Sequence, residues 1–197
     1  MNREDYNNIV IEEAVNALKD DGVIILPTDT VYGLAVSYNS EAGVKKIYDI
    51  KKRKLDKKLP IIVNSYEMLE RYCDVDLSVI KRLHAFFPGK LTVVLKKKDS
   101  DDTIAVRMIN NEIINRIIES LDCPLYLTSA NESGEKPLND IVDIVDKFEG
   151  VVDMIVVGNK LSNVPSTIVS IDGDNLTLIR EGSLCFNDIV DTYKRGL

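Results

Sequence analysis

The chain has 197 residues, of which 45% are hydrophobic, and its 25 Lys and Arg against 32 Asp and Glu give a formal net charge of −7. That length and apolar content suffice for one full hydrophobic core, so we expect residues 1–197 to form a single domain. No window is apolar over the ~18 residues that a membrane-spanning helix needs, and the first residues lack the apolar segment of a signal peptide. A cytoplasmic protein that does not enter the membrane is expected.

Metal and disulfide chemistry find little support in the composition. Cys73, Cys123 and Cys185 lie far apart and form no Cys-x-x-Cys pair, and His84 is the single histidine. A structural zinc site needs closely spaced Cys and His ligands, and a disulfide framework needs paired cysteines. We therefore expect no resident metal and no prosthetic group.

Helices and strands are predicted to alternate along most of the chain. Apolar residues at helical spacing predict helices over residues 8–20, Ser40 to the basic run that begins at Lys51, 65–72, 77–87, 111–121, 140–148 and 186–195. Short apolar or alternating runs predict strands over residues 23–26, 60–63, 91–96, 104–108, 124–127, 153–157, 166–171 and 176–180. An Asp-Gly turn between the last two strands predicts a hairpin. This order indicates an α/β or α+β domain with a twisted, mixed β-sheet flanked by helices.

The run from Lys51 to Lys58 places six cationic side chains within eight residues of an acidic chain. Such a local exception to the overall charge predicts a site for a small polyanion rather than for a long one. The alternative is a solvated helix end, whose lysines only complement the helix dipole.

Two polar loops follow predicted buried strands. They are Pro27–Leu34, after the first strand, and Thr128–Gly134, after the strand that ends at Leu127. Loops at strand ends often carry the binding residues of α/β domains, although each of these alone is more typical of a turn or a helix cap. If the second loop is extended, Ser129 and Asn131 point to one side of it and can serve one cavity.

Taken together, these stretches resemble one enzyme family. The matching segments are Leu26-Pro-Thr-Asp-Thr-Val-Tyr-Gly-Leu34, Lys51-x-Arg53 with Lys57, Phe87-Pro-Gly-x-Leu-Thr92, Ala105-Val-Arg107, Thr128-Ser-Ala-Asn131-x-Ser-Gly134, Pro165-Ser-Thr167 and Arg180-x-Gly182. They resemble the YrdC/Sua5 family of threonylcarbamoyl-AMP synthases across residues 23–182. The chain is similar to the short, single-domain type of that family, and the resemblance implies a largely open sheet.

The resemblance also implies a reaction and its partners. Members of the family condense L-threonine, bicarbonate and ATP, with Mg²⁺ accompanying the nucleotide, to threonylcarbamoyl-AMP and pyrophosphate. The product supplies the tRNA threonylcarbamoyl-transfer machinery that makes N6-threonylcarbamoyladenosine (t6A). A carboxylate must approach a polyphosphate in this step, so cations that neutralise charge fit the chemistry. Arg53 offers a planar fork, and Lys51 and Lys57 offer point charges.

By the same resemblance, individual residues take expected roles. Catalysis is expected of Lys51, Arg53, Ser129 and Asn131. ATP is expected to bind at Arg53, Lys57, Thr103, Asn131, Asn139 and Arg180. Threonine is expected to bind at Thr30, Arg107, Ser129 and Ser166.

The chain departs from the family pattern at four positions. Lys54, Lys90 and Ile109 stand where many relatives have proline, which bears on loop geometry more than on chemistry. Ile62 stands where some relatives have a histidine near the threonine. No residue suggests itself as a general base, since His84 lies on a predicted helix, so positioning and electrostatics are expected to carry the mechanism.

Two other functions fit the sequence. One is a weakly RNA-binding module, because Lys45 and Lys46 lie close to the basic run, although the negative net charge and the lack of interleaved aromatic residues argue against it. The other is a regulatory member of the same fold without synthase activity, which the Ser129-x-Asn131 pair argues against. A P-loop nucleotidase is excluded, because no Gly-x4-Gly-Lys-Ser/Thr sequence is present.

Overall fold

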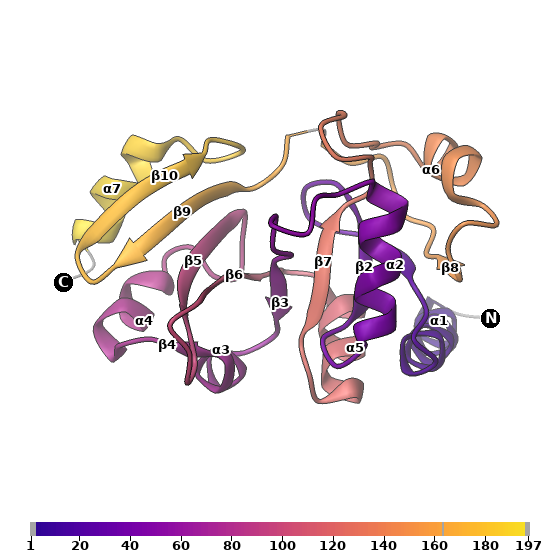
Figure 1. The fold of residues 1–197 in the computed structure, drawn as a ribbon, viewed down its shortest axis with the longest axis horizontal. Helices are drawn as coiled ribbons and strands as arrows, with labels where there is room; N and C mark the ends of the chain where they lie inside the picture. The colour runs from indigo at the N-terminus through magenta and orange to yellow at the C-terminus, as the bar shows by residue number, and fades with distance from the viewer. Residues whose placement is uncertain (1–2, 163, 196–197) are drawn as a thin grey trace.

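The computed structural model describes residues 3–162 and 164–195 (Figure 1). Its helices are α1 (Arg3–Lys19), α2 (Glu41–Lys51), α3 (Tyr66–Tyr72), α4 (Leu77–Leu83), α5 (Glu112–Leu121), α6 (Ile141–Phe148) and α7 (Phe186–Arg195). Its strands are β1 (Ile24–Pro27), β2 (Tyr32–Ser37), β3 (Ile61–Val63), β4 (Cys73–Asp74), β5 (Leu91–Lys97), β6 (Thr103–Met108), β7 (Leu125–Ser129), β8 (Met154–Ile155), β9 (Thr167–Asp172) and β10 (Asn175–Arg180).

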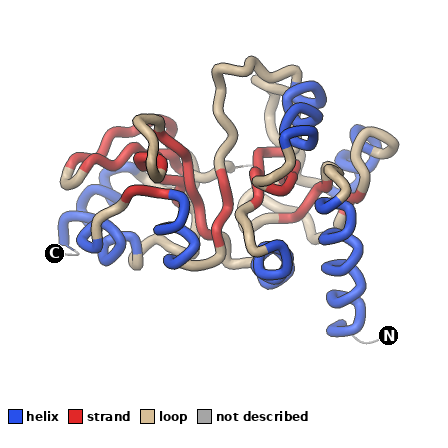
Figure 2. Tube along the Cα trace, turned by 60° about the horizontal axis from the view of Figure 1, so that its bottom comes forward, coloured by secondary structure: helices blue, strands red, loops and turns tan. Residues whose placement is uncertain are grey.

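The described strands join in one mixed sheet. The sheet has ten strands in the order β10-β9-β5-β6-β3-β7-β2-β1-β8, and β4 pairs with β5 outside this path. The pairs β1–β8, β3–β6 and β5–β9 are parallel, whereas the other pairs are antiparallel. Figures 1 and 2 show the sheet twisted and open, with helices packed against it. The predicted fold class is confirmed.

Two apolar clusters hold the helices to the sheet. The larger cluster contains side chains of α1, α3, α4, α5 and α7, among them Leu18, Leu69 and Ile117. The smaller cluster joins Ile47 of α2 and Phe148 of α6 to β1 and β2. Burying a side chain of this size contributes about 1.5–3 kcal/mol relative to exposing it. Helices α2 and α6 therefore pack against the β1–β2 end of the sheet.

Helix α2 begins where the sequence predicts. The Ser40 Oγ accepts a hydrogen bond of 2.8 Å from the Gly43 N–H, which satisfies one of the free donors of the first turn. The helix ends at Lys51, and Lys52 follows in the left-handed region at φ 48°. The basic run therefore starts in the last turn of α2 and continues as a loop.

Strand β2 is an element that the sequence reading does not predict. Residues 27–34 are expected as one polar loop, but the chain turns at residues 28–31 and returns antiparallel to β1, with Ile25 opposite Leu34. All six residues of β2 are buried, so no alternation of polar and apolar residues marks the strand. The polar loop is in fact a tight hairpin turn.

Three further boundaries differ from the prediction. Helix α1 begins at Arg3 rather than near residue 8, and β8 covers only Met154–Ile155 of the strand expected at 153–157. Helix α4 ends at Leu83, and the residue that follows, His84, closes the helix with its ring 4.3 Å from the Tyr66 ring. His84 is exposed apart from this ring contact.

Candidate active site

The hairpin turn between β1 and β2 fixes a buried threonine. The Thr28 Oγ1 accepts hydrogen bonds of 3.1 Å from the backbone N–H groups of Thr30 and Val31, and it donates to the Val31 carbonyl at 2.6 Å. The Thr30 side chain is 1% exposed, and its hydroxyl lies 3.1 Å from that of Thr28. A hydroxyl that bonds its own turn in this way sets the backbone conformation locally. The turn thus presents Thr30 in one orientation.

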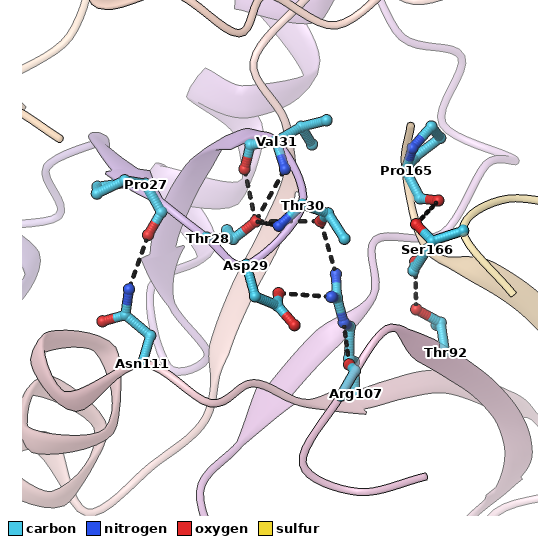
Figure 3. Close-up of polar contacts among 12 residues, drawn as sticks. Pro27, Thr28, Asp29, Thr30, Val31, Thr92, Arg107, Asn111, Pro165 and Ser166 are labelled. Atoms are coloured by element: carbon cyan, nitrogen blue, oxygen red, sulfur yellow. Dashed lines mark hydrogen bonds and ion pairs between the residues drawn. The ribbon is translucent and has the colours of Figure 1, made fainter. Parts of the chain in front are cut away.

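Arg107, near the end of β6, is held by three groups (Figure 3). Its Nε donates to the Gly89 carbonyl at 2.8 Å, one terminal nitrogen donates to the Thr30 Oγ1 at 3.1 Å, and the other contacts the Asp29 carboxylate at 2.5 Å. Burial lowers the pKa of Arg107 from its ordinary value, and the charge of Asp29 counteracts that shift. Since two of the five N–H donors remain, Arg107 can still bind a carboxylate.

Asp29 is a site residue that the sequence reading missed. Its carboxylate forms a largely buried ion pair with Arg107, with side-chain exposures of 17% and 7%. The two residues are 78 positions apart in the chain, so no local pattern connects them. The sequence feature that could have indicated Asp29 is an acidic residue between two threonines in a turn at the end of a strand.

Ser166 and Thr92 form a second buried polar group. Their hydroxyl oxygens lie 2.8 Å apart, and the two side chains are 6% and 4% exposed. A terminal nitrogen of Arg180 donates to the Ser166 carbonyl at 2.8 Å. The strand pairing of β5 with β9 brings these residues together, because Thr92 lies opposite Ile168. Burial lowers the pKa of Arg180 from its ordinary value.

Lys51 is buried and fixes the loop after β7. Its Nζ donates to the carbonyl oxygens of Ser129 at 2.5 Å and Asn131 at 2.7 Å, and its own carbonyl accepts from the Ser133 N–H at 2.8 Å. Burial, followed by the nearby charges of Arg53 and Lys147, lowers the pKa of Lys51 to about 8. Lys51 therefore acts on backbone carbonyls rather than on the cleft itself.

Arg53 closes the exposed part of the basic run into a loop. Its Nε donates to the Lys57 carbonyl at 2.9 Å, and a terminal nitrogen donates to the Lys58 carbonyl at 2.9 Å. The Tyr48 hydroxyl also donates to the Lys57 carbonyl, at 2.9 Å. The loop is thus tied to its own arginine and to the side of α2.

Several of these residues line one open cleft of about 820 Å³, a volume that includes solvent at its mouth. Its lining consists of Thr28, Thr30, Val31, Arg53, Lys58, Pro60, Ile62, Thr92, Ala105, Arg107, Leu127, Thr128, Ser129, Pro165, Ser166, Ile168 and Arg180. Six of the predicted site residues line it, namely Thr30, Arg53, Arg107, Ser129, Ser166 and Arg180. The cleft has cationic, hydroxyl and aliphatic parts.

Asn131 is placed differently from the prediction. Its Nδ2 donates to the carbonyl oxygens of Glu132 at 2.7 Å and Glu135 at 2.8 Å, which turns the amide into the loop that follows. Its Oδ1 is buried and has no hydrogen-bond partner among the described residues. Ser129 lines the cleft and Asn131 does not, so the expected extended loop does not bring both side chains to one wall.

Four other predicted residues also lie outside the cleft lining. Lys51 is behind the loop, Lys57 is exposed, and the Asn139 carbonyl accepts from the Leu161 N–H at 2.9 Å. Thr103 lines a separate hollow of about 500 Å³ instead. Lys58 lines both hollows, so the basic loop lies between them.

Over the described ranges, no helix is long and apolar enough to cross a membrane. The same part of the chain holds no group of three or more His, Cys, Asp or Glu side chains arranged to bind a metal ion.

Comparison with known proteins decides the family. A family model described as "Telomere recombination", Sua5_yciO_yrdC, matches residues 16–182. This chain belongs to the Sua5/YciO/YrdC family. All the residues that line the cleft lie within the matched range, and the cleft is the candidate active site.

Individual relatives agree in sequence and in fold. A Methanocaldococcus jannaschii protein named as a candidate threonylcarbamoyl-AMP synthase is 33% identical and covers 91% of this chain and 88% of its own length. The Pyrococcus abyssi threonylcarbamoyl-AMP synthase is 30% identical over 95% of this chain, which spans 58% of that protein. The crystal structure of Pyrococcus abyssi Sua5 complexed with L-threonine has a TM-score of 0.85 at 30% identity, covering 92% of this chain and 56% of the other.

Proposed function

We propose that this chain is an L-threonylcarbamoyladenylate synthase, a nucleotidyltransferase that joins L-threonine, bicarbonate and ATP. The observation that carries the proposal is a cleft lined by Arg107, Arg53 and Arg180, with Thr30 bonded to the first of them. Guanidinium groups suit the bidentate binding of carboxylate and phosphate groups. The names of the relatives and the threonine bound to one of them support the same assignment.

In the proposed reaction, the amine of threonine and bicarbonate form a carbamate with loss of water. A carbamate oxygen then attacks the α-phosphorus of ATP, which enters as its magnesium complex. The new oxygen–phosphorus bond forms as the bond to the β-phosphate oxygen breaks, and pyrophosphate leaves. Arg107 would hold the amino-acid carboxylate, while Arg53 and Arg180 would neutralise charge on the phosphates.

Positioning completes the proposal. Lys51 holds the two carbonyl oxygens on either side of Ala130 and so fixes the end of β7, from which Ser129 enters the cleft. Once the carbamate is formed, its attack needs no proton transfer, so a cleft without a conventional general base is compatible with the reaction. The product would serve the machinery that transfers threonylcarbamoyl groups to tRNA.

Synthase activity is preferred over RNA binding because acidic side chains offset part of the basic run. Lys52 pairs with Glu132 at 2.9 Å, and Lys58 pairs with Asp102 at 2.8 Å. These pairs reduce the positive charge that the loop would offer to an RNA backbone.

The test is release of pyrophosphate by the purified chain with ATP, magnesium, bicarbonate and threonine. We expect release to require both bicarbonate and threonine, and serine to be poorer by about tenfold, since it lacks one methyl group. The adenylate should be detected by mass spectrometry. Equal release without bicarbonate would rule out the carbamate route.

A further inference from the structure

Strand β10 contains one extra residue just before Arg180. Leu178 pairs with Val169 of β9, but the next pair is Arg180 with Ile168, so Ile179 is the extra residue between them. Figure 1 shows the two strands side by side, and β10 is the last strand of the sheet at this end. A register shift of this kind is a β-bulge, which changes the direction of the side chains that follow it.

The bulge decides which face of the sheet Arg180 occupies. Residues paired across two strands lie on the same face, and successive residues of a strand alternate between faces. Val169 belongs to the larger apolar cluster, whereas Ile168 lines the cleft. With regular pairing, Ile179 would face the cleft and Arg180 would face the apolar cluster. The bulge leaves Ile179 55% exposed and brings Arg180 into the cleft lining.

Thr167 fixes the chain directly after Arg180. Its Oγ1 accepts hydrogen bonds from the N–H groups of Gly182 at 2.9 Å and Leu184 at 3.0 Å, and it donates to the Leu184 carbonyl at 2.6 Å. The side chain is fully buried, and these three bonds use the whole capacity of a hydroxyl. Because Thr167 precedes Ile168, it lies on the face opposite the cleft, and it is not among the lining residues.

Close backbone packing holds the same segment. A Cβ atom on Gly182 would come within 2.6 Å of the Ser166 carbonyl oxygen, so only glycine permits this approach. The N–H and the hydroxyl of Ser183 both donate to the Pro165 carbonyl at 2.9 Å. Arg180 itself donates to the Ser166 carbonyl at 2.8 Å. The segment after β10 therefore cannot slip along β9 without breaking these bonds.

We infer that Thr167 is a positioning residue, whose hydroxyl holds the bulged register of β10 and so directs the Arg180 guanidinium toward an anionic ligand in the cleft. Thr167 acts from the other face of the sheet and touches no ligand. The inference rests on the proposed function only for the identity of the anion, which is the triphosphate of ATP.

The test is a double-mutant cycle, with affinity for magnesium-ATP measured by calorimetry. Thr167→Val keeps the shape of the side chain and removes the hydroxyl. It should weaken ATP binding about tenfold in the wild-type background and less than about twofold in the Arg180→Ala background, because Thr167 acts through Arg180. Thr167→Ser keeps the hydroxyl and should stay within about twofold of the wild type.

Tyr193→Phe is the matched control for a loss of stability in the same hairpin. It removes the hydrogen bond of 3.0 Å that the buried Tyr193 hydroxyl donates to the Gly173 carbonyl, in the turn between β9 and β10. That turn lies at the other end of the hairpin from Arg180, so ATP affinity should change less than about twofold. If Thr167→Val does not fold, Ser183→Ala replaces it in the cycle, with an expected loss of about two- to threefold that disappears in Arg180→Ala.

Each result decides a different point. Unchanged ATP affinity in Thr167→Val, an equal loss in both backgrounds, or the same loss in Tyr193→Phe would overturn the inference. ATP affinity is measured without threonine and bicarbonate. Pyrophosphate release that needs neither of them would therefore overturn the proposed function and leave the inference standing. Absence of ATP binding to the wild type would overturn both.

Discussion

Arg107 and Arg53 both reach the cleft, but the protein holds them in different ways. Arg107 is 6% exposed and is fixed by Gly89, Thr30 and Asp29, which come from two distant segments. Arg53 is partly exposed, and its hydrogen bonds in the described part of the chain go to carbonyl groups of its own loop. The Arg107 end of the cleft is therefore preorganised, whereas the Arg53 end belongs to a loop that can adjust to a ligand at a smaller cost.

The largest expected effect is at the preorganised end. Arg107→Ala should weaken threonine binding at least about a hundredfold, because it removes a charged hydrogen-bond donor and leaves Asp29 without its partner. Arg107→Lys should recover only part of this loss, since it keeps the charge without the fork. Calorimetry measures both, with Arg116→Ala on the exposed side of α5 as the matched control. Unchanged threonine affinity in Arg107→Ala would move the carboxylate site elsewhere.

A smaller effect is expected at the residue that holds Arg107. Asp29→Asn keeps the size of the side chain and removes its charge, so Arg107 should lose orientation but remain in place. We expect an increase in the KM for threonine of about tenfold with the KM for ATP changed less than about twofold. Asp29→Glu, which restores the charge, should recover part of the loss. An equal rise in both KM values would indicate a general loss of structure instead.

Substitutions in the loop that carries Arg53 should lower ATP affinity to different degrees. Arg53→Ala removes a cleft-lining group and the two hydrogen bonds that close its loop, so ATP affinity should fall about tenfold. Lys57→Ala removes an exposed side chain outside the cleft lining, and a two- to threefold loss, about 0.5 kcal/mol, is expected. Titration of ATP into both variants checks the order. A larger loss in Lys57→Ala would mean that ligand binding rearranges the loop.

The smallest effect on activity is expected when Lys51 loses its proton. This proton loss can be measured through its effect on the free energy of unfolding. Because burial lowers the pKa of Lys51 to about 8, the folded protein releases this proton at lower pH than the unfolded chain does. Between pH 8 and the unfolded value near 10.5 the unfolded state binds more protons, so stability relative to Lys51→Met should rise with pH. The expected rise between pH 7 and 9.5 is up to about 2 kcal/mol, measured by urea unfolding. A flat difference would mean that Lys51 keeps an ordinary pKa.

Local features of this chain could be predicted from the sequence, whereas contacts between distant segments could not. Several features depend on neighbouring residues alone: the helix caps, the hairpin near the C-terminus and the basic run. The Ser40 cap and the fold class were predicted correctly. The predicted residues that line the cleft belong to recognisable motifs. The contacts of Asp29 and Thr92 were not predicted, because their partners lie 78 and 74 positions away. Asn131 was placed wrongly since the loop after β7 turns back instead of staying extended.

The pairing of β5 with β9 has a consequence for how the protein reaches its working form. This parallel pair joins residues 91–94 to residues 167–170, and it brings Ser166 and the end of β10 to the rest of the cleft. Contacts of such long sequence separation form slowly, because a large loop must close before they contribute. During synthesis, helices and the first hairpin can form on a partial chain. The cleft is completed only when the last quarter of the sequence has docked, so catalytic competence should be the last property that a folding molecule acquires.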